Sequence, residues 1–153
     1  ARYVLMQTEE QSIGETNERT LSLADRWILS KLQSFKENFH QQMADYRFDL
    51  LAQEVYDFLW TTYCDWYLEL SKPVLTQDSF SNFEKQGTRW TLLFVMEEML
   101  RIMHPCMPFM TEEIWHRIVP LLQISKAPSI MVSSIPQVDN QWKNPEAERD
   151  LEW

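Results

Sequence analysis

Glycine occurs only twice in this chain of 153 residues, at Gly14 and Gly87. Hairpin turns and phosphate-binding loops use glycine because it adopts positive φ without steric cost. A β-rich fold or a nucleotide-binding α/β fold would therefore need more glycine than this chain contains. The shortage favours a fold of long helices, with a core filled by many of the seven Trp, eight Phe and five Tyr side chains.

Apolar side chains recur three and four residues apart along most of the chain, which is the spacing that forms one stripe along an α-helix. This spacing predicts helices over residues 21–44, 47–71 and 84–104, and a fourth helix from Thr111 to about Leu122. The third segment is apolar on nearly every side of its central part. We therefore expect it to lie between other helices.

Two residue patterns predict where these helices begin and end. Pro73 is expected to end the second helix, because proline lacks an amide hydrogen and restricts the residue before it. Residues 73–83 would then form a crossover loop. Thr111 suits the N-cap of the fourth helix, where Glu112 and Glu113 would complement the helix dipole.

The remaining segments complete the predicted architecture. Residues 1–8 are interpreted as the end of a helix that begins upstream, and residues 9–19 as a polar loop. The β-prone run 129–136 is expected to be extended. The predicted fold is all-α, an antiparallel bundle of four main helices with a short extended C-terminal segment. We assign residues 1–136 to this helical domain and residues 137–153 to an acidic tail or linker.

A search for catalytic or metal-binding patterns identifies no candidate active site, and no cofactor is predicted for this chain. The histidines and cysteine at 104, 106 and 116 supply three ligands, whereas a structural zinc site needs four, so no metal site is predicted. Cys64 and Cys106 lack the spacing of a disulfide framework. They are expected to pack as small apolar groups in the reducing cytoplasm.

Four aromatic residues, Trp60, Tyr63, Trp66 and Tyr67, follow one another at helical spacings. They could form a surface on which nucleic-acid bases stack. The favoured interpretation is structural, with the four rings on one buried side of a helix.

The formal net charge of −9 argues against nonspecific binding of nucleic acid, which usually requires a basic protein. Charges are nearly balanced between residues 19 and 50, so an RNA contact in this part of the chain would have to be local. No apolar run approaches the length of a membrane span, and no membrane association is predicted.

Three sequence runs are more specific than these patterns. They are LADRWILS at 23–30, YCDWYLELSKP at 63–73 and HPCMPFMTEEIW at 104–115. Together they resemble the helical anticodon-binding domain of valyl-tRNA synthetases. The third run is also similar to isoleucyl and leucyl enzymes, whereas the second favours the valyl enzymes.

This resemblance implies a function for the chain. The chain is expected to bind the anticodon stem-loop of valine tRNA as part of a larger enzyme that ligates valine to tRNA using ATP with Mg²⁺. The nucleotide-fold signatures of that enzyme are missing, and the chain begins without Met. We therefore expect a fragment without catalytic activity, whose partners are valine tRNA and the missing catalytic domain. A cytoplasmic monomer is expected.

The resemblance also indicates candidate RNA-binding residues. The run Arg2-Tyr3-Val4-Leu5 is similar to a family segment whose aromatic residue stacks on an anticodon base. Aromatic stacking and an adjacent guanidinium are both suited to single-stranded RNA. Arg26 and Lys31 are further candidates for contacts with the RNA backbone. Alternatively, Tyr3 covers the core, and Arg26 and Lys31 are simply solvated.

The alternative function is a helical protein–protein interaction bundle that has no RNA binding of its own. Such a protein would present an exposed apolar patch of a few hundred Å² to its partner.

Overall fold

The computed structural model describes residues 1–9, 11–15, 18–124 and 127–151. The chain forms two compact units, one of residues 1–20 and 78–136 and the other of residues 21–77 and 137–153. The described parts of both units consist of helices and irregular segments without a strand, which confirms the all-α prediction. The chain passes from the first unit to the second after Thr20, returns after Gln77 and passes again after Pro136.

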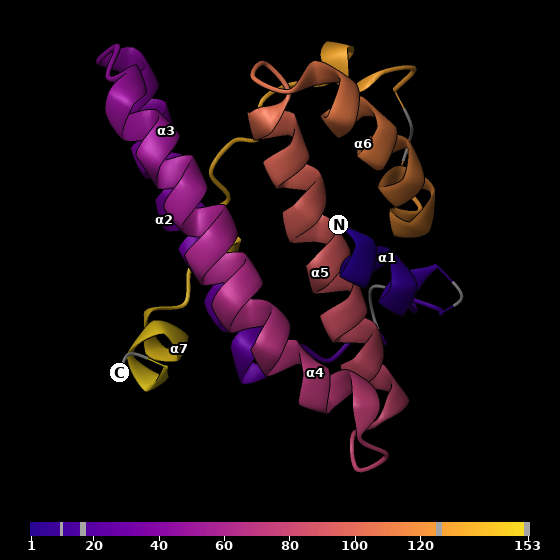
Figure 1. Cartoon of the computed structure of the whole chain (residues 1–153). Coiled ribbons are helices and arrows are strands. Elements are labelled where there is room, and N and C mark those ends of the chain that lie inside the picture. The colour runs from indigo at the N-terminus through magenta and orange to yellow at the C-terminus, as the bar shows by residue number, and fades with distance from the viewer. Residues whose placement is uncertain (10, 16–17, 125–126, 152–153) are drawn as a thin grey trace. The chain divides into compact units, whose positions relative to one another are not determined.

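The first unit is built around one long buried helix. Its elements are α1 (Arg2–Thr8), α5 (Asn82–Met103), α6 (Pro108–Leu122) and the short 3₁₀ helix η2 (Ile130–Val132). Helix α5 contacts both α1 and α6, and α6 returns alongside it (Figure 1). The sequence predicted this burial of α5. The core side chains of α5 and α6 include Leu92, Leu93, Val95, Met99 and Ile118.

The second unit contains a long helical hairpin. Its elements are α2 (Leu23–Ala44), α3 (Phe48–Asp57), η1 (Phe58–Tyr67), α4 (Leu68–Thr76), the 3₁₀ helix η3 (Asn140–Trp142) and α7 (Pro145–Asp150). Helices α2 and α3 lie side by side (Figure 1). Tyr46, with a positive φ of 56°, lies in the tight turn between them.

Segment η1 is a π-helix that joins α3 to α4 without a break. A π-helix closes its hydrogen bonds over five residues instead of four, which widens each turn. At its end, the amide of Leu68 donates to the carbonyl of Tyr63. Tyr63 and Tyr67 are both fully buried, whereas Trp60 and Trp66 are 56% and 49% exposed. The prediction of one buried aromatic stripe was therefore wrong for the two tryptophans, because the wider turn distributes the four rings over two sides.

Pro73 lies inside α4 and does not end the helix. The missing proline amide removes one hydrogen bond, but Val74 and Leu75 are buried immediately after it. Burial of these two side chains offsets the loss and extends the helix to Thr76. The predicted crossover loop is correspondingly shorter, since α5 begins at Asn82.

The fourth helix begins earlier than predicted. Helix α6 starts at Pro108, and proline suits this position because its missing amide hydrogen would have no helical partner. Thr111 is therefore not the N-cap. Its buried hydroxyl donates to the carbonyl of Met107 at 2.7 Å. Glu112 accepts hydrogen bonds from Ser129 and the amide of Ile130, at 2.8 and 3.4 Å.

The β-prone run 129–136 is not fully extended. It contains the 3₁₀ turn η2, because the Ser129 side chain accepts a hydrogen bond from the amide of Met131.

The stretch after residue 136 contacts α2. Farther along, Asn144 caps α7, and Ala147 is buried. Glu148 accepts a hydrogen bond from Ser30 of α2. These bonds and the contacts of η3 and α7 hold residues 137–151 on α2.

Candidate nucleic-acid interface

Helix α1 presents the first pair of predicted RNA-binding residues. Val4 and Leu5 face the core of the first unit, and the Thr8 hydroxyl donates to the carbonyl of Val4 at 2.8 Å. Arg2 is exposed and Tyr3 is half-buried. The structure therefore leaves the guanidinium of Arg2 accessible, whereas the hydroxyl of Tyr3 is buried.

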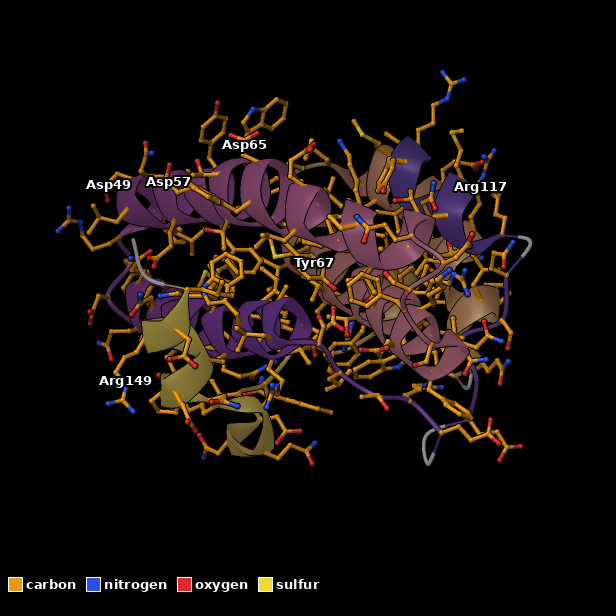
Figure 2. All side chains as sticks on the ribbon, turned by 90° about the horizontal axis from the view of Figure 1, so that it is seen from below. Asp49, Asp57, Asp65, Tyr67, Arg117 and Arg149 are labelled. Atoms are coloured by element: carbon orange, nitrogen blue, oxygen red, sulfur yellow. The ribbon has the colours of Figure 1, made fainter. Side chains whose placement is uncertain are left out.

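An open hollow of about 540 Å³ lies between α1 and α6. Its walls include Arg2 and Met6 from α1 and Ile114 and Arg117 from α6. Figure 2 shows Arg117 projecting beside α1. Met6 is 67% exposed, so the hollow combines accessible apolar surface with two guanidinium groups and with the carboxylates of Glu9 and Glu113. An aromatic or apolar surface flanked by arginines is the combination that suits a base and its phosphate.

No sequence pattern points to Arg117 as an RNA-binding residue. Its guanidinium lies 3.4 Å from Glu113, one helical turn earlier, and both side chains are mostly exposed. An exposed ion pair of this kind contributes little stability and can be displaced by a stronger anion. The sequence pattern alone gives no sign that α6 borders α1, so only the fold indicates that Arg117 shares a hollow with Arg2.

Arg26 and Lys31 both lie on α2, in the other unit. Arg26 is exposed. Lys31 is half-buried and forms an ion pair with Glu148 at 3.2 Å. The two residues are five positions apart, which places them on different sides of an α-helix. The four predicted residues are therefore divided between the two units, and the two on α2 do not share a side of the helix.

The surroundings of Lys31 are acidic. It lines a hollow of about 390 Å³ between α2 and α3 together with Glu54 and Asp57. Glu54 accepts hydrogen bonds from Asn38, at 2.7 Å, and from Gln42. A phosphate at this place would have to displace Glu148 and approach two further carboxylates. The α2–α3 hollow is lined by one cation and two carboxylates, whereas the α1–α6 hollow is lined by two guanidinium groups and two carboxylates, so the charge balance favours the α1–α6 hollow for RNA.

Both histidines that were considered as metal ligands have other partners, and Cys106 is exposed. Nδ1 of His104 lies 2.8 Å from the Thr111 hydroxyl, and Nε2 of His116 lies 2.7 Å from Glu112. Over the described residues, no group of three His, Cys, Asp or Glu side chains could hold a metal ion. Nor is any described helix long and apolar enough to cross a membrane.

The two thiols differ from the prediction that both are packed. Cys106 is exposed and Cys64 is half-buried. Partial burial raises the pKa of the Cys64 thiol, and the neighbouring Asp65 raises it further. The early start of α6 explains the exposure of Cys106, since the chain turns back to the helix at this residue.

A family model described as the anticodon-binding domain of tRNA ligase matches residues 25–153. The chain belongs to this family. A valine–tRNA ligase of Legionella pneumophila strain Lens is 46% identical to this chain, and the alignment covers all of the chain. A valine–tRNA ligase of Psychrobacter arcticus is 40% identical, again over the whole chain. The domain spans 17% of the first relative's length and 16% of the second's. The family match begins after α1, but both relatives align with α1 as well.

Proposed function

We propose that this chain is the anticodon-binding domain of a valine–tRNA ligase and that it binds the anticodon stem-loop of valine tRNA. The observation that carries the proposal is the identity of 40–46% to valine–tRNA ligases over the entire chain. The whole ligase would join valine to tRNA in the cytoplasm, using ATP with Mg²⁺ bound by parts of the enzyme that lie outside this chain. The domain itself would position the RNA as part of a monomeric enzyme.

In this proposal the hollow between α1 and α6 receives the RNA. Tyr3 does not line the hollow itself, so its half-buried ring would stack on a base beside it, while the exposed guanidinium of Arg2 contacts the adjacent phosphate. Arg117 supplies a second cation from the opposite wall once the RNA displaces Glu113. Arg26 and Lys31 are proposed as secondary backbone contacts. Lys31 is the weaker of the two because Glu148 already pairs with it.

The net charge of −9 limits the affinity of the isolated domain. Long-range repulsion opposes the approach of a polyanion, so the attraction depends on a few local cations and on stacking. Affinity should therefore fall steeply as salt rises, with a slope that reflects the number of phosphates contacted.

A salt titration of matched variants tests these roles. Arg2→Gln and Arg117→Gln should each lower the slope of log K against log salt by about 0.7–0.9, the value for one lost phosphate contact. Arg149→Gln is the matched control, because Arg149 is an exposed arginine on α7 in the other unit (Figure 2). An equal loss of slope in all three variants would mean that RNA binding depends only on the net charge of the domain.

Variants of Tyr3 test stacking separately from charge. Tyr3→Phe keeps the ring and should retain affinity. Tyr3→Leu keeps an apolar side chain but removes the ring, and should weaken binding by about 5- to 150-fold, which corresponds to roughly 1–3 kcal/mol per stacked base. Unchanged binding of a folded Tyr3→Leu domain would remove Tyr3 from the interface.

A further inference from the structure

The continuous helix formed by α3 and η1 exposes aromatic side chains on the side opposite its buried tyrosines. No described residue of α3 is buried, and Tyr56 and Trp60 are 57% and 56% exposed. Their rings are stacked, with centroids 5.8 Å apart and planes only 4° from parallel. The two rings therefore stack on each other and present aromatic surface to water.

Carboxylates flank this surface. Figure 2 shows Asp65 on the side of the helix away from Tyr67. Asp57 is exposed three residues before Trp60 and also lines the α2–α3 hollow. Neither aspartate forms an ion pair with a described residue, although Asp57 accepts a hydrogen bond from Gln53 at 2.9 Å. Asp49, one further carboxylate along α3, is already paired with Arg47 at 2.8 Å. We call Tyr56, Asp57, Trp60 and Asp65 the acidic aromatic face.

The charge of this face excludes two partners. A phosphate backbone would be repelled by both aspartates, so the stacked rings are unsuited to RNA despite their shape. A second copy of the chain would bring a further net charge of −9 against the same carboxylates. A cationic partner would instead be attracted by these carboxylates.

Arginine is the cation that matches both parts of the face. Its planar guanidinium stacks on an aromatic ring and simultaneously donates paired hydrogen bonds to a carboxylate, whereas lysine offers only a compact point charge. Because the two rings already hold each other in place by stacking, their side chains lose little conformational entropy when a partner binds over them.

We infer that the acidic aromatic face docks an arginine-bearing segment of another protein. One guanidinium lies on the Tyr56–Trp60 stack, and its donors, or those of a neighbouring arginine, bind Asp57 or Asp65. This surface is distinct from the α1–α6 hollow, so the inference does not depend on the proposed RNA binding.

The test measures binding of a labelled peptide with two arginines in an otherwise neutral sequence to the 153-residue chain. The wild-type chain should bind this peptide more tightly than the same peptide with lysines. Trp60→Leu should weaken binding by about tenfold and Asp65→Asn by a few-fold. Trp60→Phe, which keeps an aromatic ring, should restore most of the affinity.

Matched controls separate docking from general attraction to an acidic protein. Trp66→Leu removes a tryptophan of the same helix that is 49% exposed and is not part of the stack, and Glu146→Gln removes an exposed charge on α7. Both should bind the arginine peptide like the wild type. The inference is overturned if Glu146→Gln loses as much as Asp65→Asn, if folded Trp60→Leu binds unchanged, or if no peptide binding occurs at low salt. Loss of RNA binding in Trp60→Leu would instead assign the face to RNA.

Discussion

The hydroxyl of Tyr67 donates a hydrogen bond of 2.6 Å to the carboxylate of Asp25, and both residues are buried. Asp25 also accepts from the amide of Ser22, whose hydroxyl in turn accepts from the amide of Asp25. The start of α2 is thereby tied to the end of η1. A buried carboxylate of this kind requires its donors, because burial without them is costly.

Tyr67→Phe should therefore lower the free energy of unfolding by about 2 kcal/mol, since it leaves a buried charged acceptor short of one donor. Urea denaturation followed by circular dichroism measures the change. Tyr56→Phe is the control, because it removes the hydroxyl of an exposed ring and should change stability very little. Equal stability of the two variants would show that the hydrogen bond to Asp25 is not needed.

A second buried carboxylate holds α5 and α6 together. Glu97 accepts a hydrogen bond from the indole of Trp115 at 3.0 Å and pairs with Arg101 at 2.9 Å. Arg101→Met removes the cation and leaves Glu97 buried without it, so the domain should lose about 3 kcal/mol of stability.

Arg117→Met gives the matched comparison within the same unit. Its pair with Glu113 is mostly exposed, and the change should cost less than about 0.5 kcal/mol. Thermal and urea unfolding of both variants provide the measurement. Similar losses in the two would mean that burial does not set the contribution of these ion pairs.

The regular parts of the fold could be predicted from the sequence. Apolar spacing located α2, α5 and most of α6, because each buries a stripe of side chains at the α-helical period. The π-helix η1 was missed, since aromatic residues three and four apart satisfy that pattern even when the backbone turn is wider. The passage of α4 through Pro73 was also missed, because it depends on the burial of residues on the next turn.

The candidate site could be predicted only in part. Arg2 and Tyr3 were identified through resemblance to a family, which supplies residue roles that periodicity does not carry. Arg117 required the fold, because residues far apart in sequence line its hollow. The ion pair of Lys31 with Glu148 is likewise formed by segments from different parts of the chain.

The two cysteines should differ in reactivity. Cys106 is exposed, whereas burial raises the pKa of Cys64 and so lowers the fraction of reactive thiolate at neutral pH. Iodoacetamide should modify Cys106 first. The difference between the labelling rates of the two thiols should become smaller as the pH rises through the pKa of Cys64. Peptide mass spectrometry at successive times measures both rates. Faster labelling of Cys64 at neutral pH would contradict the structure.

The most direct test of anticodon binding is fluorescence anisotropy of two labelled RNA stem-loops with the 153-residue chain at low salt, about 50 mM. One carries the valine anticodon, and the other differs from it only in the anticodon bases. The proposed function predicts measurable binding and tighter binding of the valine stem-loop. Because any base can stack on an aromatic ring, this preference has to come from hydrogen bonds to the edges of the anticodon bases. Equal affinity for the two RNAs, or no binding of either, would contradict the claim that this domain reads the valine anticodon.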